Sequence, residues 1–223
     1  MAAAAQAQLA VSVSAVSDYR YRGASIGSDQ PAATLNLAYD ARASGGVDPY
    51  VGDSLTVGPL PDAGLQVFNQ SAYAGLAGPL REGLSWDIGV DHTVLAKDVG
   101  GLSHGYSPEV YAGVRSAFLS TYVRYSPHYF RDGLGVLYWE VEASAMMTAR
   151  WRAFAQAGAL TPVTSPDPYY PRREQYDGRV GVDTLFRGVI LGLAWTFQRP
   201  GYGDYGPSIT RPDAVVVTAT CVF

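Results

Sequence analysis

Charged side chains recur at every second position in several segments of this 223-residue sequence. Alternate residues of a β-strand point to the same face of a sheet, so each of these segments would carry its charges on one face. Arginine stays charged and binds carboxylates in a bidentate geometry. Facing ladders of arginine and carboxylate would therefore suit the lining of a polar interior. The residues of these ladders are Asp87, Asp91, Glu109, Arg115, Arg124, Glu140, Glu142, Arg152, Asp177, Arg179 and Asp183.

The opposite face of the same segments is apolar. In residues 84–95, for example, Trp86 and Ile88 alternate with Asp87 and Gly89. A period of two indicates half-buried strands. Twelve strands are predicted in this way, of which the segments near 47–55 and 65–77 are weaker and leave their faces unassigned. The other ten are expected over residues 8–16, 32–41, 84–95, 108–116, 119–126, 136–145, 151–159, 176–184, 189–197 and 214–223.

The expected connections alternate between long and short along the chain. The long ones cover residues 18–30, 53–64, 96–106, 127–135, 161–175 and 199–213. The short ones cover residues 43–46, 78–83, 115–117, 146–150 and 186–188. All long connections would then lie at one end of the structure. Short periplasmic turns and longer extracellular loops are typical of outer-membrane barrels.

The composition favours a membrane barrel over a soluble one. Hydrophobic residues make up 48% of the chain and charged residues 16%, compared with about 25% charged in soluble proteins. A soluble sandwich or lipocalin-like barrel also alternates, but it buries its apolar face. Here the apolar faces are broad and carry tryptophans suited to the aromatic girdles of a lipid-facing band, namely Trp86, Trp139, Trp151 and Trp195. We therefore expect an all-β, transmembrane antiparallel β-barrel of about twelve strands, forming a single domain over residues 8–223.

Other classes of function find little support in the composition. The net charge is −4 and no basic stripe is present, so nucleic-acid binding is not expected. Cys221 is the only cysteine, which excludes an internal disulfide, a CxxC redox pair and a cysteine-rich metal site. No cofactor or metal is expected.

The two ends of the chain carry their own signals. The segment Ala5-Gln6-Ala7 has the small-x-small form of a signal-peptidase site, so residues 1–7 are interpreted as a signal-peptide remnant or an artificial start; an alanine-rich start of a cytosolic protein is the alternative. The last strand ends on Phe223 and should pair with the first strand, because an open edge in lipid leaves backbone groups unsatisfied. A terminal aromatic residue also resembles the signal that barrel-assembly machinery recognises. Both termini are expected in the periplasm.

Residues 17–40 resemble a known family. Their sequence, "SDYRYRGASIGSDQPAATLNLAYD", contains a Ser-x-Tyr-x-aromatic-Arg-Gly-x-Ser segment, a Pro-Ala pair and an alternating strand that ends at a tyrosine. This pattern is similar to that of the proteobacterial TorF family of porin-like outer-membrane proteins. The resemblance implies an outer-membrane location and a channel, and supplies no substrate. The matching residues are Ser17, Tyr19, Tyr21, Arg22, Gly23, Ser25, Pro31, Ala32 and Tyr39.

Three functions fit such a barrel. Barrels of about eight strands are filled by side chains and those of about sixteen leave a channel, so twelve strands are compatible with a pore for small hydrophilic solutes or ions. In that case Arg20 and Arg22 are expected at the pore mouth. The second possibility is an occluded barrel, cross-linked by its own ion pairs, that serves as an anchor or docks an envelope protein. Membrane lipids, lipopolysaccharide and the barrel-assembly machinery are expected partners in either case.

A lipid hydrolase is the third possibility and belongs to a different class. Of the three histidines, only His128 has a serine near it in sequence, Ser126, on the same strand face. A hydrolase needs the base within hydrogen-bond reach of the nucleophile and oriented by a third group. Glu140 and Glu142 lie on the next expected strand at an uncertain height. The pattern therefore favours an ordinary polar pair at the barrel rim, and no catalytic residue is assigned.

Overall fold

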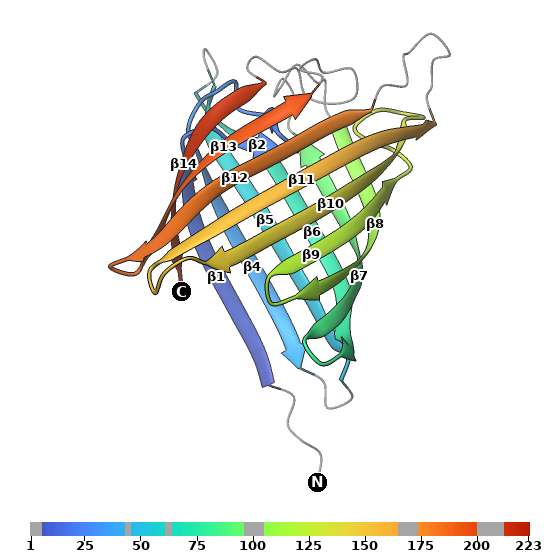
Figure 1. Ribbon diagram of the computed structural model, residues 1–223. Coiled ribbons are helices and arrows are strands. Elements are labelled where there is room, and N and C mark those ends of the chain that lie inside the picture. The colour runs from blue at the N-terminus through green and yellow to red at the C-terminus, as the bar shows by residue number, and fades with distance from the viewer. Residues whose placement is uncertain (1–5, 43–45, 61–63, 96–104, 165–173, 200–211) are drawn as a thin grey trace.

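The computed structural model describes residues 6–42, 46–60, 64–95, 105–164, 174–199 and 212–223. Twelve antiparallel strands close into a barrel, with each strand paired to its neighbours in the chain (Figure 1). Within the described ranges, no helix is long and apolar enough to cross a membrane. The barrel strands are β1 (Gln6–Val16), β4 (Ala32–Arg42), β5 (Asp48–Leu60), β6 (Gly64–Arg81), β7 (Leu84–Leu95), β8 (Gly105–Ser116), β9 (Leu119–Ser126), β10 (Gly135–Met146), β11 (Trp151–Thr164), β12 (Gln175–Phe186), β13 (Val189–Arg199) and β14 (Asp213–Val222).

The first and last strands close the barrel, as the sequence predicts. β1 pairs with β14 from Ser12, opposite Val222, to Val16, opposite Thr218. The backbone amide of Phe223 then donates to the carbonyl of Val11 at 2.9 Å. The closure satisfies backbone groups that would otherwise face lipid.

The strands turn their apolar faces outward. Leu9, Trp139 and Val217 are 65%, 54% and 54% exposed, whereas the charged residues of neighbouring positions point into the barrel. A soluble protein would bury these side chains, so this distribution identifies a transmembrane barrel. In β5 and β6, whose faces the sequence pattern leaves open, Val51 and Leu76 point outward.

One expected loop is wrong. Residues 53–64 were predicted to be a long connection, but β5 continues to Leu60, which pairs with Gly64 of β6. Gly58 and Pro59 are turn residues by local preference, yet cross-strand pairing carries the ladder through them after a bulge at Thr56 and Val57. Three other predicted loops fall mostly on residues 96–104, 165–173 and 200–211, which lie outside the described ranges.

The two ends of the barrel differ in their connections. One end carries the connecting segments 17–31 and 127–134, and we call it the loop end. The other end carries the short connections at residues 82–83, 117–118, 147–150 and 187–188, and we call it the turn end. Segment 17–31 contains a separate small hairpin of β2 (Arg20–Tyr21) and β3 (Ala24–Ser25).

Inward glycines let tyrosine rings lie flat against the barrel wall. A Cβ placed on Gly75 would lie 2.3 Å from the Tyr50 hydroxyl and 2.6 Å from the carbonyl oxygen of Ile88. Gly52, Gly89 and Gly113 accept tyrosine rings of the neighbouring strands in the same way. These rings fill the interior beside β5 to β9 and leave the opposite side of the lumen open.

We predict that Gly75→Ala lowers the free energy of unfolding by about 1–3 kcal/mol, because the added methyl group overpacks the wall against Tyr50 and the backbone. Urea titration of the refolded barrel measures this change. Ala74→Val, on the exposed outward face of the next position, is the matched control and should change stability little. Equal stability of the two variants would contradict this packing.

Candidate functional site

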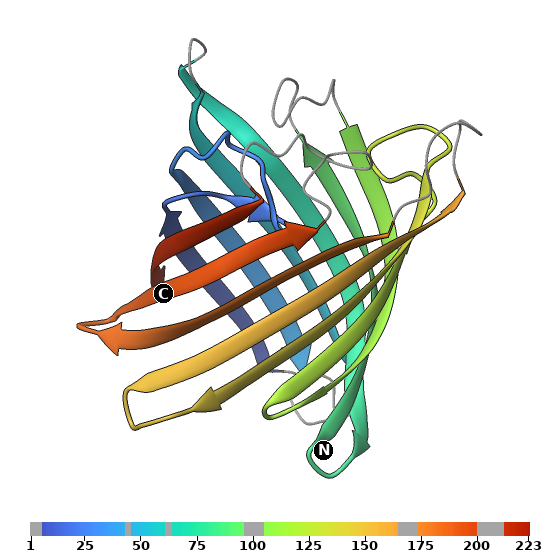
Figure 2. The ribbon, with the colours of Figure 1, turned by 45° about the horizontal axis from the view of Figure 1, so that its top comes forward.

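Segment 17–31 folds into the barrel instead of extending over it (Figure 2). Its hairpin turns at Arg22 and Gly23, whose φ angles are 48° and 78°. A tight hairpin with two positive φ angles is the type I′ geometry, which glycine adopts freely and arginine adopts at a cost. Gly23 also packs so closely on β13 that a Cβ would lie 2.5 Å from the Phe197 carbonyl oxygen. The turn therefore places Arg22 at the tip of a closely fitted internal hairpin.

Arg22 binds the barrel wall through a buried ion pair. One of its terminal nitrogens, Nη2, donates to both carboxylate oxygens of Glu109 on β8 at 2.7 Å. The two side chains are only 9% and 2% exposed. The guanidinium group also lies 3.9 Å from the ring centroid of Tyr138, and the rings of Tyr21 and Tyr129 flank it. Burial opposes the charge, but the Glu109 carboxylate raises the pKa of Arg22 well above its ordinary value, so the pair remains ionised.

Apolar side chains fill the loop end around this pair. The segment 127–134 also turns inward, and Phe130 meets Tyr21 edge to face at 5.7 Å. Burial raises the pKa of the Tyr129 phenol to about 12, so it remains neutral. The side chains of this cluster are all buried. They are Ile26, Ala32, Phe68, Leu95, Tyr129, Phe130, Leu134, Val136, Tyr138 and Leu160.

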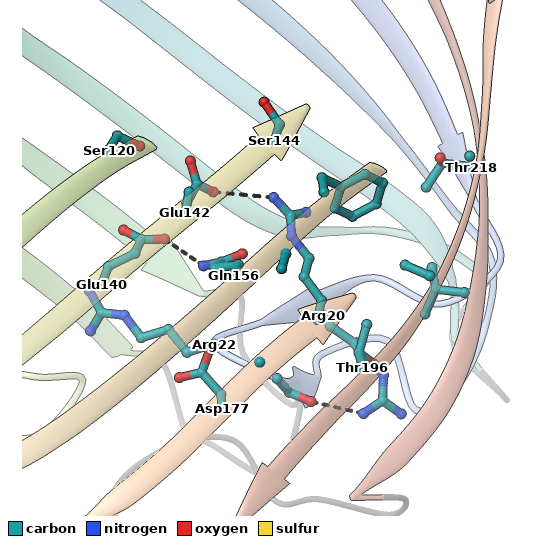
Figure 3. A pocket seen from close by; sticks show the side chains of 18 of the residues that line it. Arg20, Arg22, Ser120, Glu140, Glu142, Ser144, Gln156, Asp177, Thr196 and Thr218 are labelled. Carbon is teal, nitrogen blue, oxygen red and sulfur yellow. Dashed lines mark hydrogen bonds and ion pairs between the residues drawn. The ribbon is translucent and has the colours of Figure 1, made fainter. Parts of the chain in front are cut away.

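Below the hairpin, the lumen contains a cavity of about 1020 Å³. Tyr19 to Gly23 line its inner end, and residues of the turn at Ala117 and Phe118 line the part at the turn end. Figure 3 shows that the cavity has two different walls, with Glu140 and Glu142 on one side and Thr218 on the other. β13, β14, β1 and β4 supply a neutral wall of Thr196, Thr218, Thr220, Ser14, Thr34 and Asn36.

The charged wall is organised as ion pairs that run along the barrel. Arg124 on β9 donates to Glu140 on β10 at 3.3 Å, and Arg152 on β11 lies 2.6 Å from Asp183 on β12. These partners sit on adjacent strands. Arg179 reaches Glu142, two strands away, at 3.3 Å. The pairs thus follow the wall and leave the cavity open between it and the neutral wall.

The structure brings most of the residues predicted to line a pore into this cavity. They are Asp91, Glu109, Arg115, Arg124, Glu140, Glu142, Arg152, Asp177, Arg179 and Asp183. Asp87 also points inward but lies within the tyrosine cluster, where Tyr50 and Tyr122 donate to it. Arg20 and Arg22, expected at the mouth, lie within the barrel and line the inner end of the cavity. Arg20 pairs there with Asp18 at 2.6 Å.

Two features of the site are absent from the sequence-based prediction. The neutral wall was not identified, although Ser14, Asn36 and Thr218 alternate with apolar residues in the predicted strands. The inward fold of segment 17–31 was also missed. The Arg22-Gly23 dipeptide, between two segments that pair as Arg20 with Ser25 and Tyr21 with Ala24, was its local signal.

The serine and histidine considered for hydrolysis point in different directions. The Ser126 hydroxyl is buried and bonds with Ser107 at 3.0 Å. The His128 imidazole instead stacks on Tyr106 at 4.1 Å and lies 3.2 Å from Asp132. In the described part of the chain, this geometry provides no base-to-nucleophile contact for the pair. Nor do the described residues include a group of three or more histidine, cysteine or acidic side chains placed to hold a metal ion.

Comparison with known proteins places the fold among bacterial barrels. A family described as "Bacterial protein of unknown function (Gcw_chp)" matches residues 1–205. No curated protein matches the sequence. The structure is similar to the NanC porin, with a TM-score of 0.52, 10% identity, and 96% of this chain and 98% of that chain covered. LpxR from Salmonella typhimurium gives a TM-score of 0.47 at 11% identity, covering 96% and 99% of the two chains. The likeness to the porin shows a shared barrel fold.

We predict that Arg22→Ala lowers the free energy of unfolding by about 3–5 kcal/mol, because it leaves the buried Glu109 carboxylate without a partner. Arg115→Ala is the control, since its guanidinium is 57% exposed and lies 3.8 Å from Asp87. Replacing both Arg22 and Glu109 by apolar residues should cost less than the sum of the single changes. Urea titration of the four variants measures these differences, and equal losses for Arg22→Ala and Arg115→Ala would contradict the assignment.

Proposed function

We propose a function for a chain that belongs to the Gcw_chp family, bacterial proteins of unknown function. It is an outer-membrane channel for small hydrophilic solutes or ions, closed at the loop end by segment 17–31. The loop end faces the outside of the cell, and the turn end and both termini face the periplasm. The resemblance of residues 17–40 to the TorF family supports this assignment.

The observation that carries the proposal is the direction of the ion pairs. An occluded anchor would be expected to join opposite walls of its lumen. Here Arg124 pairs with Glu140 and Arg152 with Asp183 along the wall. This arrangement leaves a charged, water-sized space of about 1020 Å³ inside the barrel. The transport path therefore already exists in the turn-end half of the lumen.

Segment 17–31 sets the condition for passage. Its hairpin occupies the lumen and is joined to β8 through Arg22 and Glu109. Passage from the loop end therefore requires this hairpin to leave its place. The close packing at Gly23 and the buried cluster around Ile26 favour the closed state.

Removing the hairpin should open the channel. Val16 and Ala32 are directly paired in β1 and β4, so a short Gly-Ser turn can replace residues 18–30 without breaking the barrel ladder. We expect the native protein to show rare openings in planar bilayers and the shortened protein to show stable conductance steps. Ser28→Ala, an exposed position in the same segment, is the control and should behave as the native protein does.

A shortened barrel that folds but does not conduct would contradict the channel and favour the occluded, partner-docking alternative. Folding is checked independently by the slower or faster migration of the unheated protein in detergent gels. A native protein that conducts as freely as the shortened one would contradict the closing role of the segment.

Ion selectivity should be weak, because six arginines and seven acidic residues line the cavity. In the shortened protein, replacing both Arg152 and Arg179 by glutamine removes two positive charges from the charged wall. We expect the reversal potential in a salt gradient to shift toward cation selectivity. Arg150→Gln, in the turn beyond the strand, should produce a smaller shift. An unchanged reversal potential would show that ions do not pass this wall.

A further inference from the structure

A carboxylate lies on the outward, apolar face of the barrel. Asp53 of β5 is directly opposite Leu37 on β4 and Ala72 on β6. Leu37 and the next outward residue of β5, Val51, are 40% and 51% exposed. Away from the strand ends, Asp53 is the only charged side chain at an outward position of the described strands. A charge on the lipid face is unfavourable, most of all near the middle of the bilayer.

Asp53 has one partner on the same face. The side-chain amide of Gln70 on β6 donates to it at 3.2 Å. An amide nitrogen has two N–H donors and a carboxylate accepts several hydrogen bonds, so the pair keeps unused capacity in a place where lipid offers none. His92, which lies in the same row beyond Ala72, is turned toward Tyr106 and stacks on it at 5.8 Å.

The pair is aligned with the barrel axis. Gln70 lies two residues toward the loop end from Ala72, so Asp53 and Gln70 are diagonal neighbours. With strands about 4.8 Å apart and a rise of about 3.4 Å per residue, this diagonal makes an angle of about 35° with the strands. The strands of membrane barrels lean about 35–45° from the axis. In the direction in which these strands lean (Figure 1), the two angles nearly cancel.

Two copies with the same orientation in a membrane are related by a two-fold axis parallel to the barrel axis. Such an axis can pass beside the Asp53–Gln70 pair and bring it against the same pair of another copy. Each Gln70 would then donate its second N–H to the Asp53 of the other copy, an isologous contact. The neighbouring outward side chains of β6 are Ala72 and Ala74, whose small size permits close approach of the two barrels.

We propose that the outward face of β5 and β6, centred on Asp53 and Gln70, is the interface through which this chain forms a homodimer in the membrane. The contact covers the carboxylate and supplies each one with a second amide donor. The inference is independent of the channel function proposed above, because the lumen does not take part in it.

Cross-linking tests the interface in the full chain. In a Cys221→Ser background, Ala72→Cys places one thiol beside the proposed axis. Reconstituted in lipid vesicles and treated with a short bifunctional thiol reagent, it should give a cross-linked dimer. Ala155→Cys, exposed on β11 on the other side of the barrel, is the matched control and should remain monomeric.

The polar pair is then removed. Asp53→Leu combined with Gln70→Leu should abolish the dimer formed through Ala72→Cys, while the migration of the unheated protein shows that the barrel still folds. Cross-linking that persists in this variant would overturn the role of the pair. Absence of a dimer in the otherwise native background would overturn the homodimer, and would leave a different membrane protein, or lipid alone, against this face.

Discussion

The ion pair between Arg22 and Glu109 organises the loop-end half of the barrel. A guanidinium group removed from water is tolerated only when a carboxylate and further polar or aromatic groups surround it. Glu109 provides the carboxylate, and the rings of Tyr21, Tyr129 and Tyr138 provide the surroundings. Because these rings come from both inward segments and from β10, their positions depend on the pair. The apolar cluster above the cavity is assembled on the same framework.

The interior is therefore divided along the barrel axis. Toward the loop end it resembles the core of a soluble protein, with Ile26, Phe68 and Leu95 fully buried. Toward the turn end it is an open cavity with one charged and one neutral wall. The tyrosines beside Asp87 further narrow the lumen on the side of β5 to β9. A twelve-stranded ring thus encloses much less free space than its circumference would permit.

The sequence alone predicts the barrel well, because alternation of side chains is imposed by the membrane on one side and by water on the other. The faces of β7 to β14 and the closure at Phe223 follow from that constraint. The inward segment was not predicted, since its fold depends on contacts between residues distant in the chain, such as Arg22 with Glu109 and Gly23 with Phe197. The same holds for the extension of β5 through Gly58 and Pro59, where strand pairing overrides local turn preference.

The central claim is that the cavity is open to the turn end and closed to the loop end. Its most direct test is the reaction of a single cysteine at Thr218, a residue of the neutral wall, in a Cys221→Ser background. A membrane-impermeant thiol reagent is added to intact cells, or to the periplasmic face of isolated outer membranes. The account predicts rapid labelling from the periplasmic face and none from the outside. Equal labelling from both sides would contradict it.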